Sequence, residues 1–266
     1  MKKAILILIL TMPTLVVGQV AIPFQELIAT SAIKQSQRES EKLTDFIISL
    51  QQKGGNSEKK FLKSIFKAIH QKYLKTYSQY ADLGEVFHSG KYDCLTATTL
   101  FSIVLSETHF NYKIIETNYH IFLLVNTAEG QVLLETTDRI SGFVEDPTEI
   151  TSRIAVYRKN AIANTGEYKM YYQYSFNLFH EVTPNQLTGL LYFNQAIKAY
   201  NKHDLLACTT FLELSKRNYD SPRIEELAIV LMKSVLESNL STTVKSLIIH
   251  QYKNYVLSKS APVASR

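Results

Sequence analysis

The segment at residues 94–106 places the strongest constraint on the fold, because a helix formed there would be apolar on several sides. Its apolar side chains are Leu95, Ala97, Leu100, Phe101, Val104 and Leu105. A helix with so little polar surface has to be enclosed by other elements. Asp93 stands directly before the segment and can cap its first turn. We therefore expect a buried central helix.

Three strand-like segments follow this helix along the chain, at residues 112–116, 119–126 and 131–136. Residues 127–130 join the last two and suit a hairpin turn. Residues 121–125 are all apolar, so we expect the middle strand to be buried on both faces. The pattern predicts an α+β fold in which the buried helix packs on an antiparallel sheet.

Two more helices are predicted before the central one. Residues 39–52 carry apolar side chains at helical spacing, and a Gly-Gly-Asn-Ser sequence at 54–57 interrupts the pattern. Residues 58–80 carry a second apolar stripe, which predicts a helix over that whole length. Residues 141–184 show little pattern, although the aromatic-rich stretch 168–176 could add a strand.

The composition changes after Pro184, where four amphipathic helices are predicted at residues 187–200, 203–216, 222–238 and 240–257. They form two pairs that are offset by about 34 residues, the period of a tetratricopeptide repeat. We therefore interpret residues 184–257 as a tetratricopeptide-like helical region that could dock a protein partner, following a first domain at 19–183. The small and polar residues 258–266 are expected to be a mobile tail.

The first 18 residues have the pattern of a secretory signal peptide. Lys2 and Lys3 supply a positive start, an apolar run follows at residues 4–17, and Gly18 is a small residue at the expected cleavage site. The apolar run is shorter than the roughly 20 residues that a spanning helix needs. We therefore predict an exported protein, periplasmic or secreted, with no stable membrane span after cleavage.

The charge and the motifs of the chain exclude several classes of function. The net charge is +5, but the basic residues are dispersed among acidic ones and form no dense basic face for nucleic acid. The seven His and two Cys show no ligand spacing, so no metal site is predicted. No glycine-rich phosphate loop occurs either, and we expect no cofactor.

Three reactive side chains occur in order on the predicted helix and strands, namely the thiol of Cys94, the imidazole of His120 and the carboxylate of Glu135. A cysteine nucleophile needs a base to take its proton, and the base needs a third group to orient it. A hairpin would bring His120, at the start of one strand, close to Glu135 at the end of the next. Asp138, three residues further on, is an alternative third member that the pattern leaves open.

The first turn of the predicted central helix would assist the chemistry at Cys94. The positive end of the helix macrodipole favours a thiolate over a thiol. Backbone N–H groups in this turn, including that of Cys94, would hold an oxyanion, and Tyr92 is a candidate side-chain donor.

These residues resemble the transglutaminase-like superfamily of papain-like cysteine enzymes, over roughly residues 60–140. In that family a cysteine opens a buried helix, a histidine begins a strand, and a carboxylate ends the following strand. Cys94 corresponds to the nucleophile, His120 to the base and Glu135 to the carboxylate. The resemblance implies a papain/transglutaminase-like core that acts on a protein or peptide substrate. The reaction would be thiol acyl transfer through a thioester, either hydrolysis or transamidation of a peptide or side-chain amide.

Two other functions stay open at this level. The chain has no Trp and carries Glu where the family usually has Asp, which favours an inactive binding or assembly protein that works through its helical repeats. Alternatively, Cys94 and Cys208 of an exported chain could form a disulfide that staples a structural module. Cys208 lies in an apolar helical pattern, however, and we expect it to be a small buried core residue.

Overall fold

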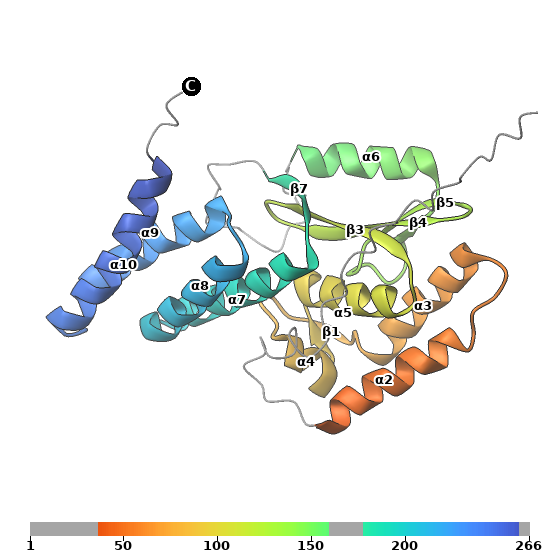
Figure 1. The fold of residues 1–266 in the computed structure, drawn as a ribbon, viewed down its shortest axis with the longest axis horizontal. Helices are drawn as coiled ribbons and strands as arrows, with labels where there is room; N and C mark the ends of the chain where they lie inside the picture. The colour runs from red at the N-terminus through yellow and green to blue at the C-terminus, as the bar shows by residue number, and fades with distance from the viewer. Residues whose placement is uncertain (1–36, 160–177, 261–266) are drawn as a thin grey trace, which may run out of the picture.

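The computed structural model describes residues 37–159 and 178–260. This part of the chain combines α-helices with a five-stranded antiparallel sheet, so the predicted α+β class is confirmed. Figure 1 shows the sheet between helix α6 (Pro147–Arg158) on one face and helix α5 (Cys94–Glu107) on the other. The sheet is therefore covered on both faces.

The sheet has the strand order β6-β5-β4-β3-β7. Its strands are β3 (Asn111–Thr117), β4 (Ile121–Thr127), β5 (Gly130–Leu134), β6 (Phe143–Val144) and β7 (Phe179–Val182). The three predicted strands correspond to β3, β4 and β5, and the predicted hairpin pairs Thr127 with Gly130. The last predicted strand ends two residues early, and β6 and β7 had no sequence signal strong enough to predict them.

Alternation along β4 divides its side chains between two apolar cores, as the period of a strand requires. Ile121, Leu123 and Val125 belong to the main core, on the face covered by α5. Phe122 belongs to a smaller core with Ile150 of α6. The expectation that β4 is buried on both faces is therefore confirmed.

Helix α5 is the buried central helix that the sequence predicts. Eleven of its residues are buried, in an unbroken run from Leu95 to Leu105. Three of these are threonines, which is tolerable because each hydroxyl finds a partner inside the protein. Thr98 Oγ1, for example, lies 2.9 Å from Thr136 Oγ1, which fixes α5 against the end of β5.

The helices before α5 are α2 (Gln37–Gln51), α3 (Glu58–Lys72) and the short α4 (Leu83–His88). The prediction that the second of these runs to residue 80 is wrong. The N–H groups of Lys75 and Thr76 both donate to the carbonyl of Gly90, at 2.9 and 3.1 Å, which draws the chain into strand β1 (Thr76–Tyr77). β1 pairs in parallel with β2 (Lys91–Tyr92). Gly90 has a φ of 74°, and a Cβ there would collide with Lys75.

The four C-terminal helices are α7 (Pro184–Asn201), α8 (Leu205–Asn218), α9 (Pro222–Glu237) and α10 (Thr242–Ser260). Each corresponds to one of the predicted helices. The apolar core is continuous from the sheet into these helices, because Leu187, Leu190 and Leu191 of α7 belong to the main core. Helix α10 continues to Ser260, so the first part of the predicted tail, residues 258–260, is helical.

Several sequence predictions fall outside the described residues. These are the signal peptide at 1–18, the additional strand at 168–176 and residues 261–266 of the tail. Among the helices that the structure does describe, none combines the length and the apolar character needed to cross a membrane.

Candidate active site

Cys94 is the first residue of α5, and its position depends on the cap formed by Asp93. Asp93 Oδ1 accepts a hydrogen bond of 2.8 Å from the N–H of Thr96, while the N–H of Asp93 donates to Thr96 Oγ1 at 2.9 Å. This reciprocal capping box starts the helix at Cys94. The thiol therefore stands at the positive end of the helix macrodipole, as expected.

His120 occupies the turn between β3 and β4. Thr117 closes this turn, because its N–H donates to the carbonyl of His120 at 2.8 Å and its Oγ1 accepts from the N–H of His120 at 3.0 Å. The imidazole is thus attached to a short turn with little freedom, and its side chain is 23% exposed.

Glu135 follows β5 directly and meets His120 as the hairpin argument predicts. Nε2 of His120 lies 2.7 Å from Oε2 of Glu135. Side chains two positions apart along a strand point to the same face of the sheet. His120 therefore lies on the face of Phe122, and Glu135 lies on the face of Leu133, which belongs to the same apolar core. The ring of His120 stacks on that of Phe122 at 6.3 Å.

The two groups hold each other in their charged forms. Burial acts to lower the pKa of His120, but the Glu135 carboxylate and a side-chain hydrogen bond with Cys94 outweigh it and raise the pKa to about 10. Burial also acts to raise the pKa of Glu135, but the charge of His120 and the hydrogen bonds to its carboxylate leave that pKa below its usual value. At neutral pH the site therefore holds an imidazolium beside a carboxylate.

Tyr157 of α6 is a member of the site that the sequence analysis missed. Its hydroxyl donates to Oε2 of Glu135 at 2.8 Å, and its ring lies 5.4 Å from that of His120. A signal for α6 was present in the sequence: Asp146 is an N-cap residue, Pro147 follows it at the first helical position, and Ile150, Ile154 and Tyr157 recur at helical spacing. Nothing in this pattern, however, indicated a role at the site.

Asp138, the alternative third member, binds its own turn instead. Its Oδ1 accepts hydrogen bonds from the N–H groups of Ile140 and Ser141, at 3.0 and 2.9 Å. Its carbonyl accepts from the N–H of Gly142 at 2.9 Å. Of the two carboxylates that the sequence left open, the structure brings Glu135 to His120.

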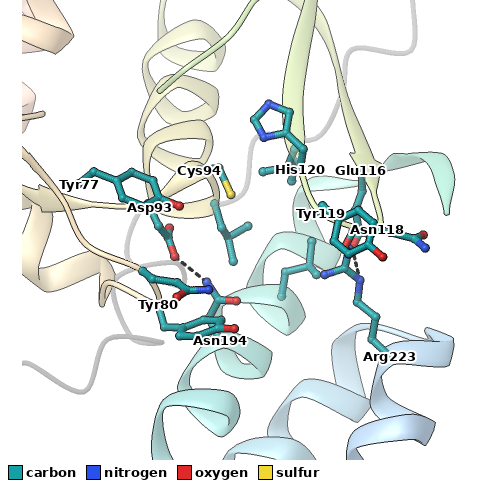
Figure 2. A pocket seen from close by; sticks show the side chains of 14 residues that line it. Tyr77, Tyr80, Asp93, Cys94, Glu116, Asn118, Tyr119, His120, Asn194 and Arg223 are labelled. Atoms are coloured by element: carbon teal, nitrogen blue, oxygen red, sulfur yellow. Dashed lines mark hydrogen bonds and ion pairs between the residues drawn. The ribbon is translucent and has the colours of Figure 1, made fainter. Parts of the chain in front are cut away.

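Cys94 and His120 line one cavity of about 130 Å³ (Figure 2). Its other lining residues are Tyr77, Gln79, Tyr80, Asp93, Leu95, Glu116, Asn118, Tyr119, Ile121, Leu190, Asn194 and Arg223. Tyr92, the expected side-chain donor to an oxyanion, is not among them. Tyr92 is buried, and its ring packs edge-on against that of Tyr77 at 6.0 Å. The tyrosines that line the cavity are instead Tyr77, Tyr80 and Tyr119.

The alternative of a disulfide between Cys94 and Cys208 is contradicted, because both thiols are free. Cys208 lies on α8 and is completely buried, as expected for a core residue. Burial, with a smaller contribution from Asp204, raises the pKa of its thiol to about 12. The two cysteines therefore have very different surroundings, one partly exposed in a cavity and the other enclosed.

In comparisons with known proteins, no protein-family model, no curated protein and no solved structure matches the chain. The interpretation of the site therefore rests on its geometry. Within residues 37–159 and 178–260, no group of three or more His, Cys, Asp and Glu side chains is placed to hold a metal ion. The reactive groups that the site brings together are the thiol, the imidazole and the carboxylate.

Proposed function

We propose that the chain is a transglutaminase-like cysteine enzyme that transfers acyl groups from peptide or side-chain amides. The observation that carries the proposal is the 2.7 Å contact between Nε2 of His120 and Glu135, because His120 lines the same cavity as Cys94. Because Nε2 faces the carboxylate, Nδ1 is the ring nitrogen left to serve the thiol of Cys94, which also raises the pKa of His120. Thiol, imidazole and carboxylate then form a connected series, which is the arrangement that thiol nucleophiles use.

In the first half of the reaction, the sulfur of Cys94 attacks the amide carbonyl carbon. The proton of the thiol passes to His120 before the attack, in keeping with the imidazolium that the site holds at neutral pH. The resulting imidazolium gives this proton to the leaving nitrogen as the carbon–nitrogen bond breaks, which releases an amine or ammonia. A thioester between the acyl group and Cys94 remains.

In the second half, water or an amine attacks the thioester, and His120 accepts the proton of the attacking group. The carbon–sulfur bond breaks, and the sulfur leaves with that proton. The product is a carboxylic acid after attack by water, or a new amide after attack by an amine. Glu135 stabilises the imidazolium in both halves through its contact with Nε2.

The tetrahedral intermediate of each half carries a negative oxygen. The first N–H groups of a helix have no acceptor within the helix, and Cys94 is the first residue of α5. Its N–H therefore serves as a donor to the oxyanion, assisted by the macrodipole. The removal of one such donor in other enzymes typically costs about 100-fold or more in rate.

The arrangement of the fold also supports the transglutaminase-like proposal. A buried helix begins with the cysteine and packs on an antiparallel sheet, whose neighbouring strands lead to the histidine and the carboxylate (Figure 1). The sequence resemblance implies a core with these features, so this arrangement supports the proposal. The competing function, an inactive assembly protein with the same fold, predicts a thiol of ordinary reactivity at the same place.

Alkylation of the folded protein by iodoacetamide tests the proposal, with each cysteine followed by peptide mass spectrometry. Cys94 should react at pH 7 at least about 100-fold faster than Cys208, since it is partly exposed and lies beside an imidazolium while Cys208 is enclosed. His120→Gln should slow the labelling of Cys94 specifically. Any release of new amines from casein should disappear in Cys94→Ala. Equal labelling of the two cysteines, or labelling of Cys94 that ignores His120→Gln, would support the inactive protein instead.

A further inference from the structure

Arg223, at the start of α9, reaches the turn that carries His120. Its Nη2 donates to the carbonyl of Asn118 at 2.7 Å and also to the carbonyl of Thr117. Asn118 and Thr117 stand two and three positions before His120 in a turn of four residues. A single guanidinium group thus holds two successive carbonyls of the turn between β3 and β4, although it lies more than 100 residues away in the sequence.

The guanidinium is itself anchored by a buried carboxylate. Nε of Arg223 lies 3.2 Å from Oε1 of Glu116, whose side chain is only 3% exposed. Oε2 of Glu116 accepts from the hydroxyl of Tyr219 and lies 3.3 Å from Nε2 of His180. A buried carboxylate is costly unless it is paired, so these contacts fix Glu116. Glu116 in turn fixes the orientation of Arg223 (Figure 2).

The C-terminal helices also contact the segment that presents Cys94. Nδ2 of Asn194, on α7, donates to Oδ2 of Asp93 at 2.8 Å. Asp93 is the capping residue that starts α5 at Cys94. Two helices of the C-terminal region therefore contact the two segments that present the thiol and the imidazole.

We propose that Arg223 is a positioning residue for His120, and that the C-terminal helices complete the active site instead of forming a separate binding module. This inference rests on the proposed function. The guanidinium fixes the distance between the His120 ring and the sulfur of Cys94 by clamping the turn. A displacement of about 1 Å at a reacting group typically costs about 100-fold in rate, so such a clamp is functionally significant.

Arg223→Lys is the informative variant. An ammonium group retains the positive charge beside Glu116 but lacks the planar fork that engages two carbonyls and a carboxylate at once. Arg217→Lys is the matched control, since Arg217 lies on α8, is 66% exposed and pairs only loosely with Glu213, at 3.8 Å. Both variants are compared with the wild-type full chain by cooperative urea unfolding and by the rate of iodoacetamide alkylation of Cys94 from pH 5 to 9.

We expect Arg223→Lys to unfold cooperatively and to alkylate Cys94 about tenfold more slowly at pH 6 to 7. Its pH profile should move toward that of a simple thiol, because a displaced imidazolium no longer supports the thiolate. Arg217→Lys should keep the wild-type profile. A structural role alone would lower the stability without moving the profile of the folded molecules.

The outcomes separate this inference from the proposed function. If His120→Gln slows labelling and Arg223→Lys keeps the wild-type profile, only the positioning role is overturned. If Arg223→Lys loses cooperative unfolding, Arg223 is a residue of the fold and the positioning role is overturned as well. If His120→Gln itself labels like the wild type, the proposed function fails at its first step.

Discussion

The hydroxyl of Tyr157 donates a hydrogen bond of 2.8 Å to Oε2 of Glu135, from a helix on the face of the sheet opposite to α5. The site is therefore assembled from both faces: α5 supplies the thiol, and α6 supports the carboxylate. The same oxygen of Glu135 contacts Nε2 of His120, so Tyr157 influences the base through the carboxylate.

Tyr157→Phe tests this support. The ring should stay packed against Phe122, at 4.8 Å, while the carboxylate loses one donor. Hydrogen bonds to charged groups contribute about 1.5–3 kcal/mol, so we expect the free energy of unfolding in urea to fall by about 1–2 kcal/mol. Tyr192→Phe is the control, since the ring of Tyr192 stacks on Phe211 at the surface of α7 and α8. Equal effects of the two changes would contradict the role of the Tyr157 hydroxyl.

Glu135→Gln and Asp138→Asn distinguish the two carboxylates. A carboxamide at position 135 cannot stabilise the imidazolium, so the pKa of His120 should fall. The imidazolium should then persist over a narrower range of pH, and the alkylation of Cys94 should slow where it is lost. An asparagine at 138 keeps the Oδ1 acceptor for Ile140 and Ser141, so we expect labelling within about twofold of wild type. A larger effect at Asp138 than at Glu135 would overturn the assignment.

The sequence predicted the central helix and three strands because their signals are local. The run of buried side chains in α5 has a composition that no exposed helix tolerates, and the hairpin at residues 127–130 has a recognisable turn. The order of Cys94, His120 and Glu135 on these elements then predicted that the three residues lie close together. The choice between Glu135 and Asp138 could not be made, since both follow the same strand and only the hydrogen bonds of the Asp138 turn separate them.

The contacts that complete the site were not predictable, because they join segments that are distant in sequence. Arg223 donates to Asn118, and Tyr157 donates to Glu135. No sequence pattern around these residues indicates which residue will be the partner. The prediction of one helix over residues 58–80 was wrong for the same reason. Its apolar stripe continues past Lys72, but pairing with the distant Lys91–Tyr92 strand outweighs the local helical preference.

The stability of the protein should depend on pH through His120. Its folded pKa of about 10 lies above the reference value of 6.5, so the folded state binds more protons between these values. The stabilisation is therefore complete below about pH 6.5 and is lost as the pH rises toward 10. Urea unfolding at pH 6, 8 and 10 should show a falling free energy of unfolding in the wild type and a shallower slope in His120→Gln. Parallel slopes would mean that His120 is not held as an imidazolium.

His70 should make the stability of the protein depend on pH in the opposite direction to His120. It is buried on α3, its ring nitrogens have no hydrogen-bond partner among the described residues, and its ring packs on Phe66 at 4.6 Å. Burial, reinforced by the charge of Arg139, lowers its pKa to about 4. The folded state thus favours neutral His70, and stability present above about pH 6.5 should be lost as the pH falls toward 4. We expect His70→Leu to reduce the loss of melting temperature between pH 7 and pH 5. An unchanged loss would place the acid sensitivity elsewhere.

Gly189 is a point of close contact between α7 and the chain that leads from α8 to α9. A Cβ at this position would collide with Cβ of Tyr219 and lie 2.9 Å from its backbone nitrogen. Backbone cannot move aside as a flexible side chain can, so Gly189→Ala should push α7 away from Tyr219. Overpacking of this kind costs about 1–3 kcal/mol, which exceeds the gain of up to about 1 kcal/mol from the helix propensity of alanine.

Gly55→Ala is the matched control for this change, because a Cβ at Gly55 has no heavy atom within 4 Å. Its effect on the free energy of unfolding should stay within about 0.5 kcal/mol. Tyr219 also donates to Glu116, the anchor of Arg223, so Gly189→Ala should disturb the site as well as the fold. We expect slower alkylation of Cys94 in the folded Gly189→Ala protein and wild-type alkylation in Gly55→Ala. A Gly189→Ala protein that is destabilised but labels like the wild type would show that the contact between α7 and Tyr219 serves stability alone.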